Sequence, residues 1–590
     1  MAEEKELNEQ IDEVQASFIL AQVKEAYERT KEQMQPFHDE MKRLFAATYV
    51  MKGERANGSN FFFPKAFEHV DRIKSTLLGD SPKFKTNPLI NKNPLKPEQD
   101  IVGYARAIEL GLQHFWNAYN SQDELDSIVS AGLSQRVSYA RVHFKQKLMK
   151  VDSGGHEMEE VIAEYPCFES LDPLRVFFDP TIPRWDDLPF VIYAAGKVRK
   201  SDLINSDKSM NVDKIEKLAS SGKLDSENSI NEKFQGQGFV LNQSSNSDND
   251  WVDVIEYYGL LKLNQSDSVE DERLYKVHVA GDSVIIRLEP IKFIPIECFT
   301  PFKIPNQIIG HGITSLIEQA QRAYNLMRSM RFDNIGLTVN QMFKYKIGSG
   351  INVKYLRSRQ GGIIPMKNLD DVQPLQIPDV TGNSFNETNS LGTEMQQIAA
   401  TIDPTQASTQ NSFTNTATGE SIRYNIFQQR VRKIRSSLEN FMGRVGRKML
   451  LRIAEEQKAR SITVYDEQLK QFYQVVDDVF DNIDDFYSVS VVMGSTAFDS
   501  PENERDEALA LAQLAIAFKA QGVNINMTPV AKNALSTFKK ANIEEIILDE
   551  PPAEQNRGGG QIPQSVIDQV SRTGETIDEQ FNKQINEKLG

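Results

Sequence analysis

The sequence predicts an α+β protein, mainly helical, in which a β-rich block lies between helical regions. Apolar residues between Glu3 and Thr48 recur every three or four positions among charged residues, which is typical of an amphipathic helix. Alternating apolar and polar residues, separated by turn signals, predict strands from about 140 to 305. Residues 419–457 contain no proline and predict one long helix.

The first 140 residues are expected to be helical apart from short connections. Pro64 marks the first turn of a helix that ends near Gly79, because a proline is tolerated where the first helical N–H groups have no partner. A proline-bounded extended segment follows. Residues 100–139 predict a further long helical region whose aromatic residues belong to the core.

The β-rich block contains several strand patterns. RVHFKQKLMK, LRVFFDP and PFVIYAAGKVR predict strands, and a polar helix is expected over 201–229. WVDVIEYYGLL, LYKVHVAG, DSVIIRLEP and FIPIECFTPF predict an antiparallel run in which AGD makes a turn.

The central stretch, His311 to Gln457, predicts a helix, a basic β segment, a short helix, a loop and a long helix. KYKIG, INVKYLRSR and GGIIPMK predict short strands within 341–382, where six Lys and Arg outnumber three Asp. Contact of this segment with DNA phosphates and docking onto an acidic partner are both compatible with its charge. The loop Asp403–Thr418 consists largely of Thr, Ser, Gln, Asn and Ala, which carry no charge.

The long helix combines an apolar stripe with a basic face. The stripe, spaced by three or four, comprises Val431, Ile434, Leu438, Phe441, Val445, Met449 and Ile453. Residues 419–457 hold nine Lys and Arg against four Glu, whereas residues 461–500 hold eight acids against one Lys. The two segments can neutralise each other within one subunit or across an interface, and we favour the interface.

Further elements follow towards the end of the chain. ITVYD and FYSVSVVMGS predict strands. A helix is expected to begin after Ser500 as N-cap, with Pro501 in its first turn, and to end before Gly522.

No catalytic motif stands out. The sequence lacks a phosphate-binding P-loop, a GxSxG elbow and an HExxH helix, and Gly310-His311-Gly312 is expected to be a helix-start turn rather than a phosphate loop. The cluster Asp477–Asp485 has the chemistry to hold Mg²⁺, but a solvated acidic face is favoured. The two cysteines predict buried thiols in a reducing cytoplasm, and no cofactor is expected.

Net charge and hydropathy limit the kinds of partner that the sequence predicts. A formal charge of −16 argues against a protein that wraps duplex DNA, but not against one through which DNA passes. No apolar run approaches the roughly 18 residues that cross a bilayer, and the N-terminus is acidic, so neither a membrane span nor a signal peptide is expected.

The order of these parts resembles that of bacteriophage portal proteins, the head-to-tail connectors of short-tailed phages. The resemblance covers about residues 10 to 550. It is carried by NFFFPKAFEHVDRIKSTLLGDSPKF, VFFDPTIPRWDDLPFVIY, VIEYYGLL and PIECFTPFKIPNQIIGHGITSLIEQAQRAYNLMRSMRFDNI, which contains the characteristic Gln and Tyr-Asn.

This resemblance implies a ring-forming fold with named regions. They are a wing over 1–305, a first stem helix over 306–340, a clip over 341–383, a second stem helix over 384–402, a tunnel loop over 403–418, a long wing helix with strands over 419–499, a crown over 500–550 and a tail over 551–590.

The resemblance also implies a function, namely a non-enzymatic dodecameric ring at one capsid vertex through which double-stranded DNA is packaged and ejected. The implied partners are other copies of the chain, major capsid and scaffolding proteins, the terminase motor, a tail adaptor and the passing DNA, with no membrane. The implied location is the virion, after assembly in the host cytoplasm. Alternatives are a tail adaptor or a metal-dependent DNA-processing enzyme using Asp477–Asp485.

Three groups of candidate site residues follow. The DNA-facing candidates in the tunnel loop are Thr405, Gln406, Ser408, Thr409, Gln410, Asn411, Ser412, Phe413 and Thr414. The clip contact candidates are Lys344, Lys346, Lys354, Arg357, Arg359 and Lys367. The subunit-interface candidates are Arg430, Arg432, Lys433, Arg435, Asp477, Asp478, Asp481, Asp484 and Asp485.

Overall fold

The chain divides into two compact units, Met1–Ala497 and Phe498–Gly590. The computed structural model describes residues 12–50, 58–79, 81–89, 101–153, 156–204, 210–218, 251–267, 271–281, 283–340, 342–356, 363–366, 368–375, 378, 381–399, 401, 417–456, 462–466, 471–475, 486–493, 510–517, 519 and 530–531. In the second unit, residues 510–517 are helical and lie within the helix predicted after Ser500. The remaining elements belong to the first unit.

Four helices form the N-terminal part of the first unit. They are α2 (Glu13–Tyr49), α3 (Lys65–Leu77), α4 (Ile101–Ala118) and α5 (Ser121–Gln135). The face that α2 buries follows the predicted spacing, with Ile19 and Val23 in its first half and Met41 and Leu44 in its second. Pro64 is the N-cap residue of α3 and so lies just before the first turn in which it was predicted.

The helix predicted through residue 139 ends earlier, and this part of the prediction was wrong. Arg136 has φ +82°, in the left-handed region, and strand β2 (Ser138–Ser153) begins two residues later. The Arg136 Nε donates a hydrogen bond of 2.6 Å to the carbonyl of Gly310, and its guanidinium pairs with Glu40. Contacts from two distant segments therefore hold a backbone conformation that L-residues otherwise avoid.

Two antiparallel sheets make up the β-rich block. One has the order β3-β2-β9, with β3 at His156–Leu171 and β9 at Ile296–Phe299. The other has the order β4-β5-β6-β7-β8. Its strands are β4 (Val176–Phe177), β5 (Phe190–Arg199), β6 (Trp251–Leu261), β7 (Arg273–Ala280) and β8 (Val284–Pro290).

Strand β9 does not continue the predicted antiparallel run. It pairs with β2 in the other sheet, where Ser138 lies opposite Phe299, whereas β6, β7 and β8 form the run as predicted. The predicted turn at AGD is present, with Gly281 at φ +54°. The helix predicted over 201–229 appears as two short helices, α6 (Lys200–Ile204) and α7 (Val212–Lys217), and residues 219–229 lie outside the described chain.

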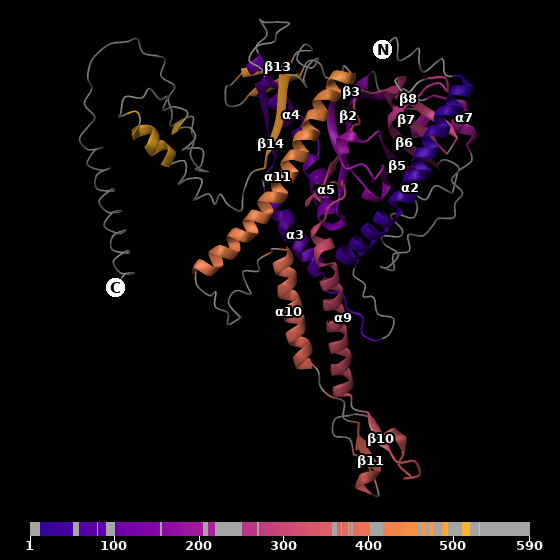
Figure 1. Cartoon of the computed structure of the whole chain (residues 1–590), viewed down its shortest axis with the longest axis vertical. Helices are drawn as coiled ribbons and strands as arrows, with labels where there is room; N and C mark the ends of the chain where they lie inside the picture. The colour runs from indigo at the N-terminus through magenta and orange to yellow at the C-terminus, as the bar shows by residue number, and fades with distance from the viewer. Residues whose placement is uncertain are drawn as a thin grey trace, which may run out of the picture. The chain divides into compact units, whose positions relative to one another are not determined.

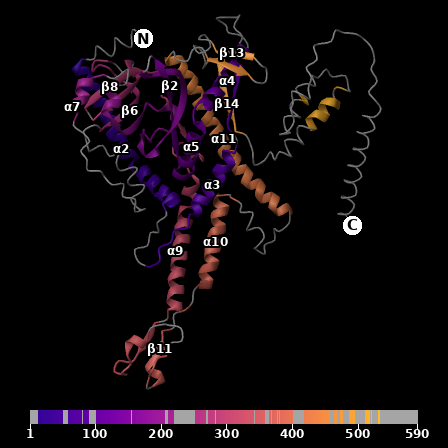
Figure 2. The same cartoon turned by 180° about the vertical axis from the view of Figure 1, so that it is seen from behind.

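A helix pair with a small β hairpin forms the next part. Helix α9 (Ile313–Val339) and helix α10 (Thr381–Ala399) lie side by side in both views, and between them in sequence come β10 (Phe343–Tyr345) and β11 (Val372–Pro374) (Figures 1 and 2). Tyr345 pairs with Val372. The strands predicted at INVKYLRSR and GGIIPMK are not found in the described chain, where Val353–Tyr355 is a 3-10 turn and 363–366 is no strand.

The long helix α11 (Ala417–Glu456) crosses the first unit and lies beside β14 (Tyr487–Val492) (Figure 1). Every residue of its predicted apolar stripe is at most 1% exposed, so the stripe is confirmed. Strand β14 pairs with β1 (Lys83–Pro88), about 400 residues away in sequence, with Lys83 opposite Val492. Strands β12 (Ile462–Asp466) and β13 (Gln471–Val475) form a separate hairpin.

Cys167 and Cys298 are both free and buried, as predicted. Among the described helices, none is both long and apolar enough to cross a bilayer.

Replacing Phe441 by Ala tests the packing of α11. Phe441 is fully buried, its ring centroid lies 5.7 Å from that of Phe299, and removing a buried aromatic side chain leaves a cavity. We expect the free energy of unfolding to fall by about 3–5 kcal/mol in urea denaturation. Asn440→Ala, at an exposed position of the same helix, serves as the control and should stay within about 0.5 kcal/mol of the wild type.

Candidate functional site

The outer parts of α9 and α10 bury polar residues and expose apolar ones, whereas Ile313, Ile317 and Met395 belong to the core of the body. Arg331 is 8% exposed and Thr388 is 3% exposed, and the Arg331 guanidinium lies 3.5 Å from the Thr388 hydroxyl. By contrast, Leu326 and Met330 on α9 and Phe385 on α10 are 46%, 50% and 53% exposed. This distribution is the reverse of that of an ordinary soluble helix pair.

The exposed apolar residues are concentrated in one region. Of the 26 large hydrophobic residues that are exposed in the described chain, 16 lie between Leu326 and Ile398. Single exposed apolar side chains are normal on protein surfaces, but such a concentration marks an interaction surface. Sequence patterning missed this surface because apolar residues at helical spacing are ordinarily assigned to a core.

The hairpin between α9 and α10 carries both exposed cations and exposed apolar side chains. Lys344, Lys346 and Lys354 are all exposed, and Ile347 is 94% and Leu369 is 86% exposed. The other clip candidates, Arg357, Arg359 and Lys367, lie outside the described residues. The described cations are thus free to meet a partner's phosphates or carboxylates, and the apolar residues fit a protein partner.

The tunnel-loop candidates all lie outside the described residues, and only the segments next to the loop can be placed. The hydroxyl of Thr401 forms a buried hydrogen bond with His69 of α3. Arg430 of α11 donates a hydrogen bond to the carbonyl of Ile398 and lies over the ring of Phe302, 5.6 Å from its centroid. Both sides of the loop are therefore held to the body of the first unit.

The subunit-interface candidates on α11 divide into two kinds. Arg430 contacts its own chain as above, and Arg435 lies 3.5 Å from the carbonyl of Thr76. Arg432 and Lys433 are exposed. Asp477, Asp478, Asp481, Asp484 and Asp485 lie outside the described residues.

The predicted basic face of α11 is only partly found in the second half of the helix, where Arg447 is exposed but two other cations point inward. Arg444 Nε and Lys448 Nζ lie 2.8 and 2.9 Å from the carboxylate of Glu297 in β9, which is only 1% exposed. Lys448 also donates to the carbonyl of Ile296 at 2.9 Å. Burial alone would raise the pKa of Glu297, but Lys448 and Arg444 lower it. Counting charges along a helix overestimates the surface charge where cations reach inward to a buried anion.

The turn before α9 depends on close backbone packing. A Cβ at Gly310 would lie 2.1 Å from the carbonyl oxygen of Phe302, and one at Gly312 would lie 2.5 Å from that of Leu133. Gly312 is the N-cap residue of α9. The prediction of a helix-start turn at Gly310-His311-Gly312 is confirmed, and the glycines are needed for close approach.

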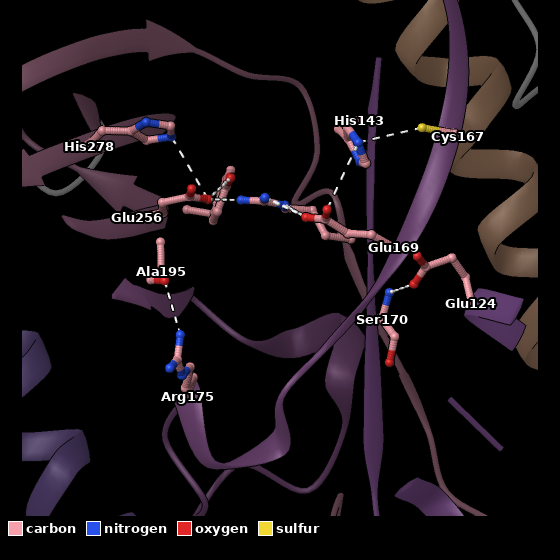
Figure 3. Close-up of polar contacts among 11 residues, drawn as sticks. Glu124, His143, Cys167, Glu169, Ser170, Arg175, Ala195, Glu256 and His278 are labelled. Carbon is pink, nitrogen blue, oxygen red and sulfur yellow. Dashed lines mark hydrogen bonds and ion pairs between the residues drawn. The ribbon is translucent and has the colours of Figure 1, made fainter. Parts of the chain in front are cut away.

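A buried cluster of charged residues joins the two sheets. Arg141 of β2 donates to Glu169 of β3 at 2.7 Å and to Glu256 of β6. The hydroxyl of Tyr258 donates to Glu256 at 2.7 Å, and His278 Nε2 lies 3.9 Å from the same carboxylate (Figure 3). Because Arg141 and Glu256 belong to different sheets, this ion pair sets the position of one sheet against the other.

Cys167, His143 and Glu169 lie together in the same cluster but do not form a nucleophilic triad. The Cys167 sulfur is 3.5 Å and the nearest Glu169 oxygen 4.0 Å from His143, and both contact the same atom, Nε2 (Figure 3). In a relay the carboxylate would orient the histidine through its other nitrogen. Burial raises the pKa of the Cys167 thiol to about 12, so the thiolate is disfavoured. The cluster is structural.

Within the described residues, no group of three His, Cys, Asp or Glu side chains is placed to hold a metal ion. The predicted alternative at Asp477–Asp485 lies outside those residues. Its solvated-face interpretation stays a prediction.

The fold is an α+β body with a helix pair whose exposed apolar residues mark an interaction surface. The family model of the phage SU10 portal protein matches residues 117–496, well over half of the chain, and the chain belongs to this family. It is therefore a phage portal protein, with a connector role and a place in the virion capsid. No curated protein matches the chain.

The buried cluster makes the first unit sensitive to acid. Burial lowers the pKa of His278 to about 3, so its neutral form stabilises the fold above the unfolded pKa of 6.5 and this contribution is lost as the pH falls towards 3. Burial alone would raise the pKa of Glu256, but the Arg141 guanidinium holds it well below its usual range. Its contribution is present above pH 4.5 and is lost at still lower pH.

We expect the free energy of unfolding, measured by urea denaturation, to fall as the pH is lowered from 7 to 4. His278 should contribute on the order of 3 kcal/mol to this loss. His278→Gln should remove the part of this pH dependence that His278 contributes, because glutamine does not titrate. His38, whose pKa burial lowers to about 4, should still contribute over the same range. His311→Gln, at a less buried histidine, is the control. An unchanged pH dependence in His278→Gln would contradict the prediction.

Proposed function

We propose that this portal protein forms a closed ring whose α9–α10 pairs line a channel for double-stranded DNA. The observation that carries the proposal is the exposed apolar surface between Leu326 and Ile398. A second copy of the chain is the partner available to every copy, and closed rings arise when one face of a subunit meets a different face of the next. Head-to-tail contacts between copies can give either a closed ring or an open filament, and the family's role in the capsid supports the ring.

The proposed regions follow the resemblance and the elements described above. Helix α9 is the first stem helix, β10 and β11 belong to the clip, and α10 is the second stem helix. Residues 1–305 and 419–499 form the wing, 403–418 the tunnel loop, 500–550 the crown and 551–590 the tail. We propose twelve copies at one capsid vertex, by analogy with the family.

The proposed partners differ between regions. The clip, with its exposed lysines and apolar residues, would meet the terminase motor and later the tail adaptor, while other surfaces meet capsid and scaffolding proteins. The tunnel loop would contact the DNA. Because its residues are uncharged, such contact allows sliding, whereas a ring of cations would bind phosphates and release counterions.

Charged substitutions on α9 test the ring. We expect the wild type to give rings with a central hole in negative-stain images, and Leu326→Glu/Met330→Glu to remain in small assemblies. The free energy of unfolding of the variant, measured by urea denaturation, should change by less than about 0.5 kcal/mol per site, because both side chains are exposed. Val14→Glu, at a residue of α2 that is 71% exposed, is the matched control and should form normal rings. A wild type that stays monomeric, or a double variant that forms normal rings, would contradict the proposal.

Replacing Gln406–Thr414 by a short Gly-Ser linker tests the tunnel loop. We expect rings to form normally, since the exposed stem surface is unchanged, and packaging or retention of DNA to be impaired. DNA content of particles assembled with the variant measures this. Normal packaging and retention would exclude a DNA-contacting role for the loop, Phe413 included.

A further inference from the structure

An extended segment of the chain is bound along α9 by hydrogen bonds from its backbone to side chains of the helix. We call residues 59–64 the strap; Ala66, which makes the last of the four bonds, is the second residue of α3. The bonds run from the N–H of Ser59 to Asp333 at 2.7 Å, of Phe61 to Ser329 at 3.1 Å, of Phe63 to Asn325 at 3.1 Å and of Ala66 to Gln321 at 2.8 Å.

The spacing of donors and acceptors explains why these four hydrogen bonds, which we call the ladder, form. The acceptors recur every four residues along α9, which is about 6 Å of helix. Three of the four donors recur every second residue of the strap, which is about 6.6 Å in an extended chain. One face of α9 therefore offers acceptors at nearly the same spacing as the edge of a β-strand, and these backbone hydrogen bonds do not depend on the side chains of the strap.

The aromatic side chains of the strap add a second set of contacts. The ring centroid of Phe61 lies 4.6 Å from that of Phe332, and the Arg328 guanidinium lies over Phe63 at 4.4 Å. Gln321 also donates to the carbonyl of Phe63 at 2.6 Å, so it holds the strap through both of its amide atoms.

The strap reaches a part of α9 that has no apolar anchor in the body. Ile313 and Ile317, near the start of α9, are fully buried in the core that α11 shares. Beyond Tyr324, the buried residues of α9 are Ser329 and Arg331, and Ser329 is itself an acceptor of the ladder. Because the strap leads directly into α3, it connects the outer half of α9 to the helices of the body.

We propose that the strap sets the angle at which α9 leaves the body, and thereby the number of copies in the ring. This inference rests on the proposed function. In a ring of about twelve copies, neighbours are related by about 30°, and one additional copy changes this angle by only about 2°. Ring size is then sensitive to a small tilt of α9, and four hydrogen bonds along its length restrict that tilt.

The test removes two acceptors and counts the copies in the ring. In Asn325→Ala/Ser329→Ala, two strap N–H groups lose their partners, and hydrogen exchange at Phe61 and Phe63 should accelerate about fivefold or more. Native mass spectrometry should then show two or more ring sizes where the wild type shows one. The matched control is Ser436→Ala/Asn440→Ala, the same residue types at the same spacing on the exposed face of α11 and outside the Leu326–Ile398 surface, which should keep the wild-type distribution.

A conservative variant separates the ladder from general damage to the fold. Asn325→Asp keeps an acceptor oxygen and should retain one ring size, and Ser329→Ala alone serves if the double variant does not fold. Rings of a single, wild-type size in a variant whose strap exchanges fast would overturn this inference and leave the proposed ring in place. A wild type without rings would overturn both.

Discussion

The packing of α9 depends on one constraint: a polar group taken out of water must find a hydrogen-bond partner or cost about 1–3 kcal/mol. The buried residues in the outer half of α9 are polar, so this half can pack only where such partners are placed. The strap supplies backbone donors along one face, and α10 supplies Thr388 on another. The apolar residues are left on the remaining surface, which is where another chain can bury them.

A related constraint joins the layers of the body. Arg141 and Glu256 connect the two sheets, and Arg444 and Lys448 of α11 hold Glu297 of β9. A buried ion pair contributes little net stability, but leaving one member unpaired is strongly destabilising. Such pairs therefore specify how the layers are positioned more than how stable they are. They also direct cations inward, which suits a protein whose proposed channel must not bind DNA tightly.

The sequence predicted most helices and most strands of the β-rich block, because periodicity and alternation are local signals. It predicted the apolar stripe of α11 residue by residue, as Phe441 and Val445 illustrate. It missed the pairing of β1 with β14 and of β9 with β2, since strand partners far apart in sequence are chosen by packing. Between α9 and α10 it predicted two strands that the described residues there do not form, and it missed β11. Short apolar runs in this part of the chain are exposed and lack a core that would impose alternation.

For the candidate site, too, some features could be predicted from the sequence and others could not. By itself, the sequence determined the order of elements, the family resemblance, the glycines before α9 and the absence of a recognised catalytic motif. Gln321, Asn325, Ser329 and Asp333 are visible in it as polar residues four apart, and Leu326 and Met330 as apolar residues four apart. Only the tertiary structure decided that the polar row binds the strap while the apolar pair faces outward. The physical reason is that a helical pattern defines which side chains share a face, whereas the partner of that face is set by segments hundreds of residues away.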